Sequence, residues 1–64
     1  MNIYGKCKPI DFFIIRTMKI EIKFSKNQRW RYHTVSDGDI EINRKGVSVI
    51  LPVKEFIRLF EVVE

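Results

Sequence analysis

The chain has 64 residues, of which 45% are hydrophobic and 31% charged, and its 12 Lys and Arg against 8 Asp and Glu give a net charge of +4. This length suits a single small domain over residues 1–64 and excludes a second domain, a dinucleotide-binding sheet or a large catalytic cleft. The longest apolar run, residues 12–15, falls far short of the roughly 20 residues that cross a bilayer, so we expect no membrane partner.

The single Cys and the single His limit how so small a domain can be stabilised. One thiol cannot form an internal disulfide, and two such ligands are too few for a structural zinc site, which needs about four. We therefore expect no cofactor. A domain of this size is only marginally stable alone, so we expect it to be stabilised as a homodimer. A lone Cys also fits a reducing compartment such as the cytoplasm.

The first third of the chain combines an irregular segment with an alternating one. Residues 1–11 show no clear periodicity, and we interpret them as a loose or edge segment. From residue 12 to 24 the apolar residues fall mainly at even positions, which predicts a strand with one solvent-facing side and a bend near Arg16. Met18 offers an alternative translation start, which would make residues 1–17 dispensable.

The middle of the chain predicts a series of antiparallel strands. After a turn at residues 25–27, the alternation over residues 28–35 predicts a strand with an apolar face and a basic face. The apolar face carries Trp30, Tyr32 and Thr34, and the basic face carries Arg29, Arg31 and His33. Asp37 and Gly38 tolerate positive φ and predict a type I′ hairpin turn. Two further predicted strands, at residues 39–43 and 47–51, are separated by a turn at residues 44–46.

The C-terminal segment changes to a helical period. Pro52 ends the last strand and suits the first turn of a helix. The apolar residues that follow are spaced as one helical stripe, at Val53, Phe56, Ile57, Phe60 and Val63. The expected fold class is therefore α+β, with an antiparallel sheet of about four strands followed by one C-terminal helix packed on one face.

Two segments resemble the PC4-like family of single-stranded-DNA-binding transcription coactivators. Residues 24–29 read Phe-Ser-Lys-Asn-Gln-Arg, where the family has a Ser-Lys-Asn-type turn followed by a basic strand. Residues 45–59 contain Lys-Gly-Val-Ser-Val, then Leu-Pro, then Glu-Phe-Ile-Arg-Leu, where the family has Lys-Gly-Ile/Val-Ser-Leu and an amphipathic helix. The resemblance covers residues 18–62 and implies dimers that bind single strands on the sheet face away from the helix.

This chain departs from the PC4-like pattern at the third strand. That strand is represented only by the sequence Asp-Ile-Glu-Ile of residues 39–42, and the connecting loop is much shorter. Purine-rich-element-binding repeats have a similar layout of four strands followed by a helix and are a second resemblance.

The distribution of positive charge points to a polyanionic partner. Residues 16–31 hold six basic residues and one acidic residue, and a field of this kind attracts nucleic acid. Interleaved aromatic rings can stack on unpaired bases, so we expect non-enzymatic binding of single-stranded DNA or RNA. The candidate binding residues are Lys19, Lys23, Lys26, Arg29, Arg31, Tyr32, His33, Arg44 and Lys45.

These features also have ordinary interpretations. Trp30 and Tyr32 share the apolar face of their strand, which favours the hydrophobic core for Trp30 and leaves Tyr32 open between the core and the rim. Carboxylates such as Glu41 can pair with the cations across strands, and cations in turns can simply be solvated. No enzyme is expected, because neither His33 nor Cys7 has the neighbours that activate a catalytic group.

A second function class stays open. A small protein-interaction module, such as an adaptor or inhibitor encoded by a phage or plasmid, would use an uncovered apolar patch. The residues that could exceed what one helix and one sheet face can cover are Phe13, Ile15, Ile50 and Leu59.

Overall fold

Seven strands and one helix make up residues 3–63, the part of the chain that this computed structural model describes. In chain order they are β1 (Tyr4–Pro9), β2 (Phe13–Arg16), β3 (Glu21–Phe24), β4 (Trp30–Ser36), β5 (Asp39–Arg44), β6 (Val47–Pro52), α1 (Val53–Leu59) and β7 (Phe60–Val62). Five strands form one antiparallel sheet, the main sheet, in the order β6-β5-β4-β1-β7. The α+β class is confirmed, but the structure has more strands than the four expected.

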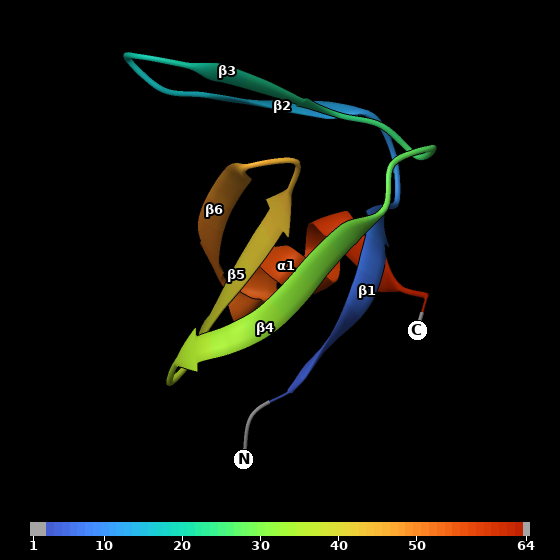
Figure 1. The fold of residues 1–64 in the computed structure, drawn as a ribbon, viewed down its shortest axis with the longest axis vertical. Helices are drawn as coiled ribbons and strands as arrows, with labels where there is room; N and C mark the ends of the chain where they lie inside the picture. Colours follow the sequence, from blue (N-terminus) through green and yellow to red (C-terminus); the bar gives the residue numbers. More distant parts are fainter. Residues whose placement is uncertain (1–2, 64) are drawn as a thin grey trace.

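β1 lies inside the main sheet, between β4 and β7. Figure 1 shows it running beside β4. Lys6 is opposite Arg31 of β4, and Cys7 is opposite Val62 of β7. The described part of residues 1–11 is therefore neither loose nor an edge. Alternation is hard to recognise there because Gly5, Cys7 and Pro9 on the inner side are not typical strand residues.

The helix α1 is shorter than its apolar stripe predicts. Phe60 has an extended backbone (φ −128°, ψ 155°), and from Phe60 the chain continues as β7 along β1. Phe60 satisfies the helical spacing and also faces the core as a strand residue, so the spacing alone does not locate the helix end. The β-branched Val62 and Val63 that follow favour an extended chain.

Residues 12–24 form a hairpin, not one long strand. β2 and β3 pair with each other in a separate two-stranded sheet that lies across one end of the main sheet, at the top of Figure 1. The turn between them is closed by the Thr17 hydroxyl, which accepts from the amides of Lys19 (3.2 Å) and Ile20 (3.0 Å).

This turn also changes which residues of the hairpin face inward. Phe13 is opposite Phe24 and Ile15 is opposite Ile22, and these four side chains pack on the core. The inward positions are odd in β2 and even in β3, so the predicted even-numbered apolar row is wrong for β2.

An aromatic cluster fills the space between the main sheet, α1 and the hairpin. Phe24 is fully buried and stacks on Phe13 (ring centroids 4.4 Å apart) and on Trp30 (4.8 Å). Tyr32 packs against Phe56 of α1 at 5.1 Å. Burying such a side chain contributes roughly 1.5–3 kcal/mol to the free energy of folding. The inner face of the main sheet therefore stabilises the fold and is not available to a ligand.

The type I′ turn that the sequence predicts at Asp37-Gly38 is found at the next hairpin turn, between β5 and β6. Gly38 has φ 80°, but among the described residues Lys45 (51°) is the one non-Gly residue with positive φ. The Asp37-Gly38 pair therefore turns the chain where expected but not as type I′. Lys45 and Gly46 (84°) supply the two left-handed residues that a type I′ turn requires.

Candidate nucleic-acid interface

The main sheet has a solvent-facing side, the open face, opposite the side that packs on α1. It carries the outward residues of β1, β4, β5, β6 and β7, because side chains alternate along each strand. These residues are Tyr4, Lys6, Lys8, Arg31, His33, Glu41, Asn43, Ser48, Ile50 and Glu61.

Arg31 lies near the centre of the open face. It is opposite Lys6 of β1 and Asn43 of β5, and the next row places His33 between Tyr4 and Glu41. Directly opposed side chains in antiparallel strands have Cβ atoms about 4.5–5.5 Å apart. The Tyr4 ring is 80% exposed and belongs to this neighbourhood. The face therefore combines cations with an uncovered aromatic ring.

One shallow depression at the end of this face where β4 begins and β5 turns into β6, the basic hollow, has a volume of about 590 Å³. Its walls contain four cations, two side-chain amides and no carboxylate, and they are formed by Asn27, Arg29, Arg31, Asn43, Arg44 and Lys45. Cations and amide N–H groups are the donors that proteins use to hold phosphate oxygens. The basic hollow thus has the chemistry of a phosphate-binding surface.

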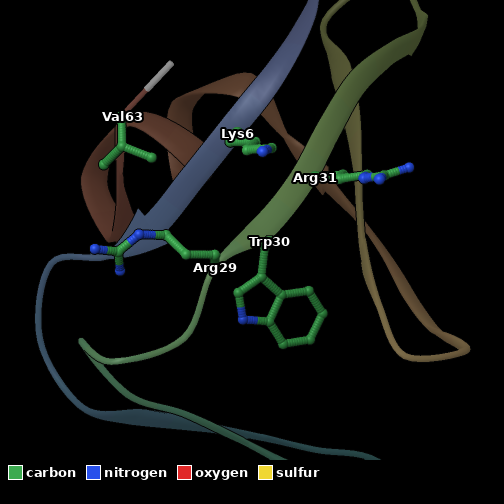
Figure 2. A pocket seen from close by; sticks show the side chains of 5 residues that line it. All are labelled: Lys6, Arg29, Trp30, Arg31 and Val63. Carbon is green, nitrogen blue, oxygen red and sulfur yellow. The ribbon is translucent and has the colours of Figure 1, made fainter.

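A neighbouring hollow of about 410 Å³ shows how the two central arginines are directed. Figure 2 shows Arg31 of β4 and Arg29, which immediately precedes this strand, extending away from one another, with Lys6 of β1 between them. The Arg29 guanidinium donates to the backbone carbonyls of Lys26 (3.3 Å) and Gln28 (3.2 Å). The expectation that Arg29 and Arg31 act side by side on one basic face is therefore wrong: the two guanidinium groups point apart, and that of Arg29 is bonded to the turn before β4.

Carboxylates pair with some cations of the open face but not with the arginines. His33 Nε2 lies 3.1 Å from Glu41 Oε1, an ion pair when His33 is protonated, and Lys8 Nζ lies 3.1 Å from Glu61 Oε1. The cross-strand alternative thus applies to His33. Within residues 3–63 no carboxylate pairs with the four cations of the basic hollow, Arg29, Arg31, Arg44 and Lys45.

Three of the predicted binding cations lie outside this surface. Lys19 is in the turn of the β2–β3 hairpin, Lys23 is on its outer side opposite Ile14, and Lys26 is in the turn before β4. Lys19 and Lys23 would face the same side as the β4 arginines only if β3 paired in register with β4. These two strands belong to different sheets, so this pairing is absent.

Tyr32 does not reach the open face, because its ring is buried against Phe56. Trp30 is also in the core, and its indole N–H donates to Gln28 Oε1 at 3.0 Å. The prediction that Tyr32 stacks on a base is therefore corrected. Tyr4 is the ring that the structure leaves uncovered instead.

Sequence reasoning missed Tyr4, Lys6, Asn27 and Asn43, which line hollows together with Arg31. The alternation Tyr4-x-Lys6-x-Lys8 was a usable signal for a strand with one polar side. The two Asn residues gave no signal, because their approach to Arg31 depends on how the turn before β4 and the pairing of β4 with β5 bring them together.

Metal ligands and the Cys7 thiol were two further candidates for a site. No group of three or more His, Cys, Asp or Glu side chains could hold a metal ion within the described residues. Burial raises the pKa of the Cys7 thiol to about 12, so the thiol is protonated and unreactive at neutral pH. In residues 3–63, no helix is long and apolar enough to cross a membrane.

Comparison with protein-family models, with curated proteins and with solved structures finds no significant match. The resemblance to the PC4-like family therefore stays a prediction, and the function is argued from the geometry of the open face.

Proposed function

We propose that this protein binds single-stranded nucleic acid, without catalysing a reaction, through the open face of its main sheet. The observation that supports this most directly is the basic hollow, where Arg29, Arg31, Arg44 and Lys45 lie together with no carboxylate in its walls. Cations in this setting neutralise phosphates and release counterions, which is the main source of sequence-independent affinity.

Single strands fit the surface better than a duplex. The one helix, α1, has seven residues and its Phe56 is buried in the core, so it is not available to enter a major groove. The open face instead offers the Tyr4 ring beside Arg31 and His33. Stacking of an unpaired base on such a ring contributes about 1–3 kcal/mol. DNA and RNA are equally suited to these contacts.

Each part of the surface has a distinct role in the proposal. Arg29, Arg31, Arg44 and Lys45 hold phosphates, and Asn27 and Asn43 donate to phosphate or sugar oxygens. Tyr4 stacks on a base. Because the lone Cys7 is a buried thiol and the chain forms no internal disulfide, we place this activity in the cytoplasm.

The central test compares charge reversal inside and outside the open face. Arg31→Glu should weaken filter binding of a single-stranded oligonucleotide by about tenfold to hundredfold, through loss of a phosphate contact and added repulsion. Lys54→Glu makes the same charge change on α1, where a carboxylate in the first turn is compatible with the helix dipole. Equal loss in both variants, or no loss in Arg31→Glu, would contradict the proposal.

Salt dependence gives a second, quantitative check. For single strands the slope of log affinity against log salt is about −0.7 per neutralised phosphate. Four contacting cations therefore predict a slope of about −3, and Arg31→Ala should make it shallower by about 0.7. Affinity that does not change with salt would exclude phosphate binding as its source.

The protein-interaction alternative is supported by a different surface than the sequence indicated. Phe13, Ile15 and Leu59 pack against the core, whereas Ile50 is exposed. Further exposed apolar residues lie on the β2–β3 hairpin, at Phe12, Ile14, Met18 and Ile20. If Met18→Ser with Ile20→Ser removes activity while Arg31→Glu does not, this alternative is favoured.

A further inference from the structure

β6 is an unusually unprotected edge of the main sheet. It stands last in the strand order, has six residues, and carries no charged side chain in its sequence Val-Ser-Val-Ile-Leu-Pro. Natural edge strands are normally kept from pairing by charge, by Pro, by bulges or by being very short, and of these β6 has only Pro52 at its C-terminal end. The other edge, β7, has only three residues and includes Glu61. The two edges therefore differ in exposure to a further strand.

The register shows which backbone groups of β6 point away from the sheet. Val53 N–H donates to Gly38 C=O (2.7 Å), directly beyond the pair of Asp39 with Pro52. Opposed residues of antiparallel strands alternate between hydrogen-bonded and non-hydrogen-bonded pairs. Leu51, Val49 and Val47 therefore bond to β5. The N–H and C=O groups of Ser48 and Ile50 face outward, with the C=O of Pro52.

We propose that β6 pairs antiparallel with β6 of a second copy of this chain, centred on Val49. In this register Ser48 is opposite the partner's Ile50, and these two residues exchange both backbone hydrogen bonds. The two-fold axis repeats the pair, so four backbone hydrogen bonds connect the copies. The exposed Ile50 side chain (58% exposed) comes to lie beside the partner's Ser48.

Charge favours a second copy in the antiparallel direction. The β5–β6 end of the sheet carries Arg44 and Lys45. The β4–β5 end carries Asp37 and Asp39 together with the cation Lys54 of α1, which follows β6 there, so that a net negative charge remains. Antiparallel pairing places the basic end of one copy near the acidic end of the other, roughly two strand spacings or about 10 Å away. Parallel pairing would place like charges together. The neutral β6 strand itself adds no repulsion.

The pairing would join the open faces of the two copies into one continuous surface. Antiparallel pairing about a two-fold axis perpendicular to the sheet keeps both open faces on the same side, because opposed residues share a side. The two Arg31 residues are then separated by five strand spacings, about 24 Å. This dimer does not rest on the proposed nucleic-acid function, and either can fail without the other.

Analytical ultracentrifugation of matched variants tests the interface. The wild-type chain should dimerise at about 10–100 µM. Ile50→Lys puts a charge on the edge and Ser48→Pro removes an outward N–H, so each should weaken the dimer at least about tenfold. Ile57→Lys, the same kind of change on the exposed side of α1, should leave it intact. A wild-type chain that stays monomeric to 1 mM, or equal effects of Ile50→Lys and Ile57→Lys, would overturn the proposal.

Amide hydrogen exchange followed by NMR tests the register without any substitution. The amides of Ser48 and Ile50 should exchange more slowly as the protein concentration rises through the dimerisation range. The Val49 amide, which bonds to β5, should be slow at every concentration and is the internal control. Free exchange of Ser48 and Ile50 in a chain that ultracentrifugation shows to be dimeric would mean that another surface forms the dimer.

Discussion

Adjacent side chains of β4 point to opposite sides of the main sheet, because side chains alternate along a strand. Trp30 is 3% exposed and belongs to the core, whereas Arg31 is exposed on the open face. The two faces of β4 could be predicted from its sequence for this reason. The role of Tyr32 could not, because it depends on Phe56, which lies 24 positions further along the chain and covers the ring.

Lys45 combines a strained backbone with a charge in the basic hollow. Its φ of 51° lies in the left-handed region, which costs a residue with a Cβ roughly 1 kcal/mol. Asn tolerates this conformation, and Asn-Gly is the preferred type I′ pair. Lys45→Asn should therefore raise the free energy of unfolding by about 0.5–1 kcal/mol and lower oligonucleotide affinity severalfold.

Urea denaturation and filter binding of the same Lys45→Asn protein would check both changes. The Lys54→Asn variant on α1 is the control that loses the same charge without relieving the turn. If Lys45→Asn changes stability and affinity in the same direction, either the strain or the phosphate contact has been assigned wrongly.

At the scale of elements, the hairpin β2–β3 shows what periodicity can and cannot establish. Alternation over residues 12–24 indicated extended chain, and that is confirmed. It did not reveal that the chain reverses between Arg16 and Glu21, because Met18 and Ile20 in the turn happen to continue the even apolar row. The reversal moved Lys19 and Lys23 away from the β4 arginines, so an error in one element became an error in the predicted site.

Substitution of two phenylalanines in this hairpin region tests which side of the hairpin packs on the core. Phe24 is fully buried and Phe12 is 57% exposed. Phe24→Ala should lower the free energy of unfolding by about 3–5 kcal/mol through lost burial and a cavity. Phe12→Ala should change it by less than about 0.5 kcal/mol. Urea midpoints of both variants provide the measurement, and comparable losses would show that the inward side of the hairpin is wrong.

At the scale of the whole molecule, the order of the strands in the main sheet could not be predicted from the sequence. The α+β class and the two-faced character of β4 follow from local patterns. The placement of β1 between β4 and β7 depends on pairs such as Lys6 with Arg31 and Cys7 with Val62, which are far apart in the chain. No local pattern encodes such partners. The open face was incomplete for that reason, since Tyr4 and Lys6 reach it only through this pairing.

The central position of β1 bears on the hypothesis that translation can start at Met18. A chain of residues 18–64 lacks β1 and β2, so β4 and β7 lose the strand between them and Phe24 loses Phe13. This chain should be unfolded, with poor dispersion in its NMR spectrum. The full-length Met18→Ala chain, altered only at an exposed turn residue, should keep its fold. A folded 18–64 chain would refute the assigned topology.

The buried indole of Trp30 provides an intrinsic fluorescence probe of the folded protein. Its ring lies against Phe24 and its N–H is occupied by Gln28, so its emission reports the integrity of the interior. A variant that binds oligonucleotide weakly but keeps the wild-type emission has consequently lost its contacts and not its interior.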